Sequence, residues 1–118
     1  MIKNILIVDD SPMIHKLLRK ILVKNDYEVV GDASNGHQGV EMYSELQPDL
    51  VFMDITMPIL NGIDAATKIK DMDCNANIIM LSAMSDDEIK EEAKQIGIDI
   101  FLNKPFNEFK IISAIAKI

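Results

Sequence analysis

The sequence predicts an α/β domain, a doubly wound parallel sheet of five strands with five helices. Short apolar runs rich in strand-forming residues alternate along the chain with stretches of helical hydrophobic spacing. This alternation is typical of a parallel sheet with helices on both faces. The connections are short, and no repeat, linker or low-complexity segment interrupts the pattern. We therefore expect residues 1–118 to form one domain.

Composition argues against several classes of function. Hydrophobic residues make up 48% of the chain and charged residues 26%, ordinary values for a globular protein, and no apolar run is long enough for a membrane span. The net charge of −7 argues against nucleic-acid binding by this domain, which would require clustered Lys and Arg. Met1 leads into an apolar run too short for a secretory signal, so we expect a cytoplasmic protein.

Cysteine and histidine give no sign of a metal site. Cys74 is the only cysteine, which rules out a disulfide within the chain and a thiolate cluster. His15 and His37 have no acidic or cysteine partner at ligand spacing, so we expect both to be solvated surface residues.

Residues 4–8 are the first predicted strand, and a helix follows at once. Ser11 can cap the start of this helix, and Pro12 suits its first turn, where the missing N–H is not needed. The apolar residues of the helix share one face at helical spacing. They are Ile14, Leu17, Leu18, Ile21 and Leu22.

A second strand is predicted at residues 27–30. Asn35 opens the next helix, which must end before Pro48 because proline disfavours helical backbone at the preceding residue. In the third strand, four consecutive apolar residues at 50–53 are typical of a strand buried on both faces, and Asp54 follows directly. Taken alone, Asp54 could be a turn-forming residue or a functional group at the edge of the sheet.

The next helix is expected to start at Asn61, and the fourth strand spans residues 77–81. Ser85 and Glu88 have the spacing of a capping box, so a fourth helix starts there and ends near Gly97. Because its apolar stripe is thin, we expect this helix to be the least firmly held of the five. The stripe consists of Ile89, Ala93 and Ile96.

The fifth strand is predicted at residues 98–102, and the last helix begins near Asn107. This helix carries two apolar stripes, of which one can face the sheet. The other can bind a partner or can simply widen the side that faces the core. The two stripes are Phe109, Ile112 and Ala116, and Ile111, Ile115 and Ile118.

Polar groups follow four of the five predicted strands. They are Asp9 and Asp10 after the first strand, Asp54 after the third, Ser82 after the fourth and Lys104 after the fifth. In the flavodoxin-like strand order 2-1-3-4-5 the first and third strands are neighbours, so the three carboxylates converge at one edge of the sheet. Two ionised carboxylates ~4 Å apart repel each other by about 4 kcal/mol at an effective dielectric near 20. Three of them therefore need a cation.

This donor set predicts phosphoryl chemistry. Oxygen ligands without His or Cys suit a hard cation, and an incomplete carboxylate set suits Mg²⁺ better than Ca²⁺, with Mn²⁺ as a second candidate. Lys104 adds a fixed positive charge, and Ser82 adds a hydroxyl. An incoming phosphoryl group requires such an environment, and Asp54 would attack its phosphorus in line to form an acyl phosphate.

With these residues in place, the chain resembles the receiver domain of two-component response regulators over nearly its whole length. The matching motifs are Asp9-Asp10, Asp54, Met57-Pro58, Gly62, Ser82 and Lys104-Pro105. The resemblance implies that Asp54 is the phosphoacceptor. It also implies that Asp10, Asp54 and the backbone carbonyl of Thr56 bind Mg²⁺ directly, and that Asp9 reaches the ion through water.

The resemblance further implies a switch and a cis peptide bond between Lys104 and Pro105. In the switch, the Ser82 hydroxyl moves to the phosphoryl group and the Phe101 ring rotates inward. Because Phe has no hydroxyl, burial of the ring must drive this step. The alternative is that Phe101 is a plain core residue.

Three further positions bear on the lifetime of the phosphoryl group. Ala83 is small and leaves the group accessible. Thr56 and Met84 lack a side chain that would orient a hydrolytic water, so we expect slow hydrolysis.

The resemblance implies a phosphohistidine of a sensor histidine kinase as the donor. The domain would not be a turnover enzyme, since it would catalyse only its own phosphorylation and slow dephosphorylation. The stretches starting at Asp54 and Asn61 are similar to those of single-domain chemotaxis regulators. This implies a chemotaxis kinase upstream and a motor switch protein or adaptor downstream, bound to the fourth helix, fifth strand and fifth helix. The state would be monomeric, or dimeric on phosphorylation.

Other functions remain open at this point. The chain could be a stand-alone receiver of another phosphorelay, or the receiver of a DNA-binding regulator. A flavodoxin-type electron carrier shares the fold, but Asp9 and Asp10 would repel the flavin phosphate. An aspartate-nucleophile phosphatase normally has a second acid where Thr56 stands, and it carries a cap insertion.

Overall fold

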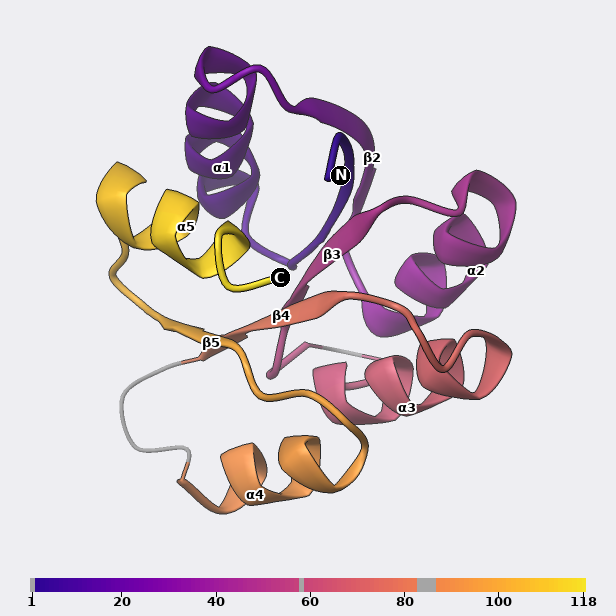
Figure 1. The fold of residues 1–118 in the computed structure, drawn as a ribbon. Helices are drawn as coiled ribbons and strands as arrows, with labels where there is room; N and C mark the ends of the chain where they lie inside the picture. Colours follow the sequence, from indigo (N-terminus) through magenta and orange to yellow (C-terminus); the bar gives the residue numbers. More distant parts are fainter. Residues whose placement is uncertain (1, 58, 83–86) are drawn as a thin grey trace.

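The computed structural model describes residues 2–57, 59–82 and 87–118. In these residues five strands form one parallel sheet in the order β2-β1-β3-β4-β5, with five helices around it (Figure 1). The elements in chain order are β1 (Asn4–Val8), α1 (Pro12–Lys24), β2 (Glu28–Ala33), α2 (Gly36–Leu46), β3 (Leu50–Asp54), α3 (Gly62–Met72), β4 (Ile78–Ser82), α4 (Asp87–Gln95), β5 (Phe101–Asn103) and α5 (Glu108–Ile115). The predicted fold class and strand order are confirmed.

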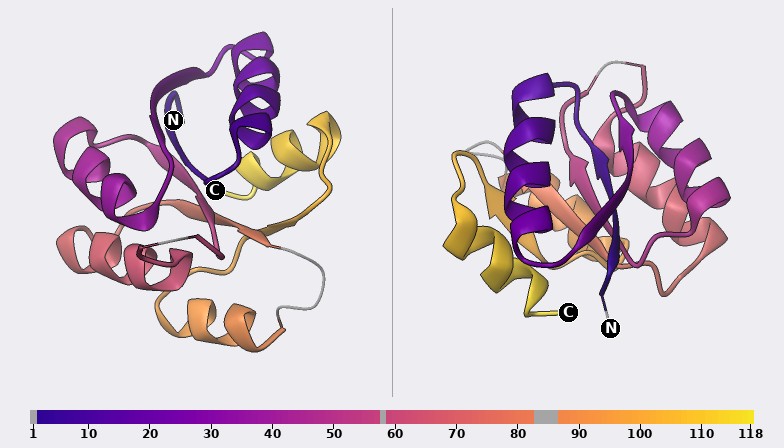
Figure 2. Two further views of the ribbon diagram at one scale, coloured as in Figure 1. Left: turned by 180° about the vertical axis from the view of Figure 1, so that it is seen from behind. Right: turned by 90° about the horizontal axis from the view of Figure 1, so that it is seen from above.

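The sheet separates two apolar cores. Helices α1 and α5 cover one face, and α2, α3 and α4 cover the other (Figure 2). Successive side chains of a strand point to opposite faces, so Ile5 and Ile7 join the core under α1 and α5, while Leu6 and Val8 join the opposite core. The central strands β3 and β4 are buried along their whole length. This burial explains their unbroken apolar sequences.

Asparagine caps three of the helices. Asn35, Asn61 and Asn107 each accept a hydrogen bond from a backbone N–H three residues later, at the starts of α2, α3 and α5. Ser11 stands at the N-cap of α1, but its side chain makes no capping hydrogen bond. Its backbone N–H instead donates to Asp9 Oδ1 at 2.8 Å. The predicted capping box of α4 includes Ser85, which lies outside the described residues.

The two edge strands differ from their predicted ranges. β2 continues to Ala33, beyond the predicted end at residue 30, because an edge strand paired only with β1 tolerates Gly31 and Asp32 in its pattern. β5 is shorter than predicted and starts at Phe101, where its pairing with Met80 of β4 begins. Ile98 is nevertheless buried, in the core on the α3 side, so its apolar character reflects packing rather than strand pairing.

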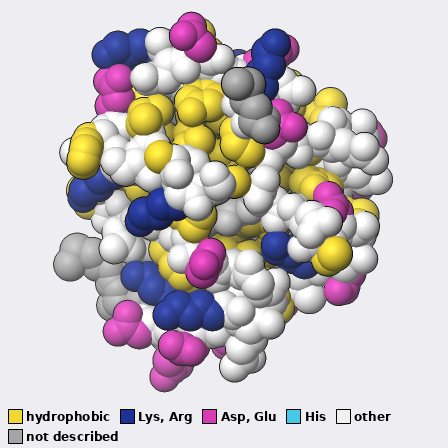
Figure 3. Space-filling model, in the orientation of Figure 1, with side chains coloured by type: hydrophobic (Ala, Val, Ile, Leu, Met, Phe, Trp, Pro, Cys, Tyr) yellow, Lys and Arg dark blue, Asp and Glu magenta, His cyan; other side chains and the backbone are white. Residues whose placement is uncertain are grey.

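The outer helices bury only part of their apolar residues. In α5, Ile111, Ala114 and Ile115 face the core, and Ile112 of the first predicted stripe also packs against it. Phe109 of the first stripe is 74% exposed and Ile118 of the second is 43% exposed, so each stripe is only partly buried. In α4 only Ala93 is fully buried, which confirms the thin apolar face. Charged side chains of both signs gather over α4, at the bottom of the view in Figure 3.

Two glycines allow the connection from β3 to α3 to fold tightly. A Cβ atom on Gly62 would lie 2.0 Å from the carbonyl oxygen of Asp54, and one on Gly36 would lie 2.1 Å from that of Leu60. The backbone N–H of Gly62 donates to the carbonyl of Ile55 at 2.7 Å. The close approach at Gly62 therefore fixes the backbone just beyond Asp54.

Helices long and apolar enough to cross a membrane are not found in the described parts of the chain.

Candidate functional site

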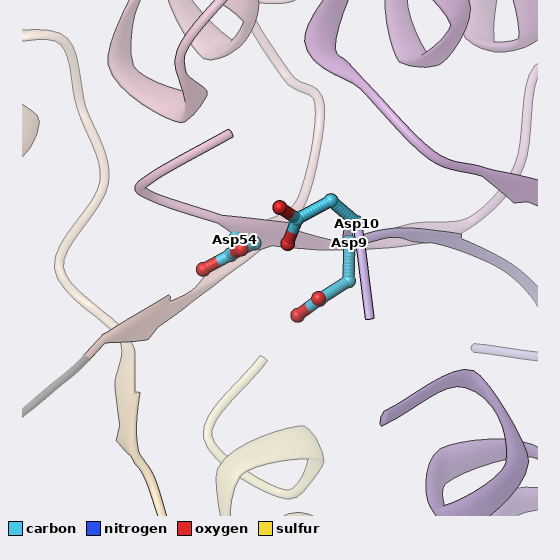
Figure 4. A group of neighbouring side chains, drawn as sticks. All are labelled: Asp9, Asp10 and Asp54. Carbon is cyan, nitrogen blue, oxygen red and sulfur yellow. The ribbon is translucent and has the colours of Figure 1, made fainter. Parts of the chain in front are cut away.

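Three carboxylates meet at the carboxyl ends of two neighbouring strands. Asp9 and Asp10 follow β1, and Asp54 is the last residue of β3, which pairs with β1. One carboxylate oxygen from each residue lies within 4.8 Å of the other two (Figure 4). Asp9 is fully buried and Asp54 is 5% exposed, whereas Asp10 faces solvent. The structure thus brings together the three acids that the sequence predicted to converge.

Lys104 joins the site from the end of β5. Its ammonium nitrogen donates a hydrogen bond to Asp54 Oδ1 at 3.2 Å and lies 3.2 Å from Asp9 Oδ2. The Lys104–Pro105 peptide bond is cis, as predicted. Lys104 therefore bridges the two buried carboxylates of the site.

The electrostatics of the site favour added positive charge. Burial, together with the negative charge of Asp9, raises the pKa of Asp54 to about 6, although Lys104 acts in the opposite direction. Burial by itself lowers the pKa of Lys104, but the charges of Asp54 and Asp9 outweigh this and leave that pKa above its ordinary value. At neutral pH one ammonium thus faces a group of three acids, and the local charge is negative.

The residues fit a hard divalent cation. Asp9 Oδ2 is buried, and within the described residues it accepts no hydrogen bond, since its contact with Lys104 lacks the geometry of one. The other oxygen of Asp9 accepts from Ser11 and is thereby oriented. A buried carboxylate oxygen without a hydrogen bond, next to two further carboxylates, can accept a hydrogen bond from the water shell of a Mg²⁺ ion.

The predicted switch residues lie on β4 and β5, the two strands that follow β3 in the sheet. Ser82 ends β4, is 1% exposed and donates its hydroxyl proton to Asn103 Oδ1 at 2.8 Å. Phe101 starts β5, and its half-buried ring packs against the core on the α3 side. Thr56 is exposed, two residues beyond Asp54.

Three of the predicted positions are not described. Pro58 of the Met57-Pro58 motif, and Ala83 and Met84 of the lifetime prediction, lie outside the described residues. The expectations attached to them stay predictions.

One group near the site was missed. His15 is not a solvated surface residue as predicted: its side chain is 16% exposed, its Nε2 lies 2.7 Å from the carbonyl oxygen of Asp9, and its Nδ1 lies 2.8 Å from Asp32 Oδ1. Arg19, one turn further along α1, also pairs with Asp32. These contacts fasten α1 to the ends of β1 and β2. The prediction failed because the second strand was predicted to end at residue 30. Asp32 was therefore not expected to belong to a strand of the sheet.

Comparison with known proteins agrees with this site. Residues 5–116 match the family model of the response regulator receiver domain. The chemotaxis protein CheY of Thermotoga maritima is 46% identical over 116 residues, covering 98% of this chain and 97% of that protein. The chemotaxis protein CheY of Bacillus subtilis is 48% identical over 117 residues, covering 99% and 98%.

A solved structure of a chemotaxis protein also resembles this chain. The CheX–CheY–BeF3–Mg²⁺ complex of Borrelia burgdorferi contains a chain that matches with a TM-score of 0.93 and 31% identity, covering 98% of this chain and 87% of that one. The fold and the acidic edge of the sheet define a receiver-type α/β domain. The chain belongs to the response regulator receiver domain family.

Proposed function

We propose that this protein is a signalling switch that accepts a phosphoryl group on Asp54 from the phosphohistidine of a sensor histidine kinase. The observation that carries this proposal is the meeting of Asp9, Asp10 and Asp54 with Lys104, whose ammonium lies 3.2 Å from both buried carboxylates. A nucleophile, a fixed cation and an oxygen-only ligand set are what phosphoryl transfer requires.

Asp54, Lys104 and Ser82 have different roles in the transfer. A carboxylate oxygen of Asp54 forms the new bond to phosphorus, while the phosphorus–nitrogen bond of the donor breaks and its electron pair stays on the imidazole. Lys104 neutralises charge on a phosphoryl oxygen. Ser82 supplies a hydroxyl to another oxygen once its hydrogen bond to Asn103 has broken.

The acidic group would hold Mg²⁺, with Mn²⁺ as a substitute. Asp10, Asp54 and the backbone carbonyl of Thr56 would bind the ion directly, and Asp9 would bind it through water. When bound, the ion supplies positive charge that neutralises the oxygens of the phosphoryl group. The protein is not a turnover enzyme, since it catalyses only its own phosphorylation and slow dephosphorylation.

The signal belongs to chemotaxis or motility control. Support comes from the two relatives named as chemotaxis proteins, each matched over nearly its full length. A chemotaxis-type histidine kinase acts upstream, in the cytoplasm. Downstream, a motor switch protein or adaptor binds the surface of α4, β5 and α5, where Phe109 is 74% exposed. The protein is monomeric, or dimeric on phosphorylation.

The test is uptake of phosphate from a small acyl phosphate with Mg²⁺, followed by intact mass. Wild type should gain one phosphoryl group that is stable in acid and labile in base, and Asp54→Asn should gain none. The exposed Asp99 provides a matched control, and Asp99→Asn should behave as wild type. Uptake of the same base-labile group by Asp54→Asn would contradict the proposal.

A further inference from the structure

A small polar cluster beside the site joins Ser82 to α4. Asn103 Oδ1 lies 2.8 Å from the Ser82 hydroxyl and 3.3 Å from the ammonium nitrogen of Lys90. Ser82 and Asn103 are paired at the ends of β4 and β5, and Lys90 belongs to α4. The same ammonium lies over the ring of Phe101, 5.7 Å from its centroid.

Lys90 fixes the direction of these hydrogen bonds. An ammonium group only donates, so the Asn103 atom that it contacts is the carbonyl oxygen and not the NH₂ group. This oxygen cannot donate, and therefore the Ser82 hydroxyl must give it the only proton that it has. While the hydrogen bond lasts, that proton is not available to a phosphoryl oxygen on Asp54.

Lys90 also contacts residues that are involved in both movements of the predicted switch, that of Ser82 and that of Phe101. Phe101 and Asn103 are two residues apart on β5, so their side chains point to the same face of the strand, and Lys90 contacts both. Movement of Ser82 toward Asp54 would take one donor from Asn103. Inward rotation of the Phe101 ring would move the ring away from the Lys90 ammonium. Both movements therefore break contacts of one small group of side chains.

We infer that Asn103 and Lys90 form a latch that holds Ser82 and Phe101 in the unphosphorylated arrangement. The inference rests on the proposed role of Asp54 and adds two positioning residues to that reaction. The phosphoryl group has to compete with Asn103 for the Ser82 hydroxyl. Removal of the latch therefore favours the arrangement that accepts a phosphoryl group.

Asn103→Val is the main test, because valine suits an edge strand and cannot accept a hydrogen bond. With saturating Mg²⁺ and a small acyl phosphate, we expect this variant to take up the phosphoryl group about 5-fold faster than wild type, the factor that corresponds to one net hydrogen bond. Lys90→Met should give a smaller acceleration, since the amide of Asn103 is then free to turn. The matched control is Lys94→Met, also on α4, which should keep the wild-type rate.

The Ser82→Ala background shows whether the latch acts through the hydroxyl. There, Asn103→Val should no longer change the rate of uptake. Equal rates for Asn103→Val and wild type, or an undiminished acceleration in the Ser82→Ala background, overturn the latch and leave Asp54 as the phosphoacceptor. Absence of uptake by wild type overturns the proposed function itself.

A measurement without phosphate tests the latch independently. The side-chain amide signal of Asn103 in nuclear magnetic resonance spectra should shift in Ser82→Ala and in Lys90→Met, and it should stay in place in Lys94→Met. A signal that moves in neither of the first two variants means that the latch does not form in solution.

Discussion

At the scale of single residues, the buried carboxylates that the site needs for phosphoryl transfer lower the stability of the metal-free protein. Asp54 is a buried acid next to the buried Asp9, and Lys104 is the only cation among the described residues that pairs with them. A buried carboxylate is destabilising when it is ionised without sufficient compensation. The metal-free protein should therefore gain stability when the charge of Asp54 is removed.

Asp54→Asn should stabilise the metal-free protein against urea at pH 7.5, by roughly 1–3 kcal/mol for a pKa raised by about two units. The pKa of Asp54 rises from 3.8 to about 6 on folding, so the folded state binds more protons between these values. Wild type thus loses stability as pH rises from about 4 to 6, and the loss is complete above this window.

Asp99→Asn removes an exposed charge and serves as the control for that comparison. Urea midpoints across pH, measured with a metal chelator present, would refute the account of Asp54 if Asp54→Asn and Asp99→Asn gained equally at every pH.

At the scale of elements, the turn after β3 sets the backbone of the nucleophile. Gly62→Ala would place Cβ 2.0 Å from the carbonyl oxygen of Asp54 and 2.7 Å from Cα of Ile55, both backbone atoms that cannot move aside cheaply. We expect a loss of roughly 2 kcal/mol or more in unfolding free energy and slower phosphoryl uptake. Thermal unfolding and intact mass would measure these effects.

Gly31→Ala is the matched control for Gly62→Ala. Its Cβ would meet the ends of the flexible side chains of Leu46 and Leu6 at 2.9 and 3.1 Å, so the cost should be small and uptake normal. An equal loss of stability and uptake in the two variants would show that the turn has no special role.

A second element-scale prediction concerns the junction of β1 and β3. Asp49 Oδ2 accepts the backbone N–H groups of Lys3 and Asn4, each at 2.9 Å, and these hydrogen bonds lower the pKa of Asp49. A depressed pKa in the folded state means that the stabilisation is present above the unfolded value and is lost as pH falls through the folded one. Asp49→Asn should therefore be less stable than wild type at pH 7, by at most about 1 kcal/mol because the group is solvated.

The two proteins should converge in stability at acid pH, below the folded pKa of Asp49. Guanidinium unfolding at a series of pH values checks this, and a difference that persists in strong acid would mean that the carboxylate charge is not responsible.

The residues at the strand ends could be predicted from the sequence, whereas the contacts that depend on the register between strands could not. Apolar runs followed by acids placed Asp9, Asp10 and Asp54 correctly, because the ends of parallel strands must meet at one edge of the sheet. The hydrogen bond from Ser82 to Asn103 could not be predicted, since it depends on the register between β4 and β5. The contacts of His15 were missed for the same reason. Asp32 lies beside His15 because β2 pairs with β1, and β2 is an edge strand with a weak apolar pattern.

At the scale of the whole molecule, metal binding and stability should be linked. A ligand that binds only the folded state stabilises it as its concentration rises above its dissociation constant. Millimolar Mg²⁺ should therefore raise the thermal midpoint of wild type, with a much smaller rise for Asp54→Asn, which lacks one of the three carboxylates. Calorimetry across Mg²⁺ concentrations checks this, and an identical rise in the two proteins would place the ion elsewhere.

The central claim is that Asp54 becomes an acyl phosphate. Borohydride reduces an aspartyl phosphate to homoserine, and peptide mass spectrometry then locates the modified residue. After incubation of wild type with Mg²⁺ and a small acyl phosphate, we predict homoserine at position 54, and none when a chelator replaces Mg²⁺. Homoserine at position 9 or 10 instead, or at no position after confirmed phosphoryl uptake, would contradict the account.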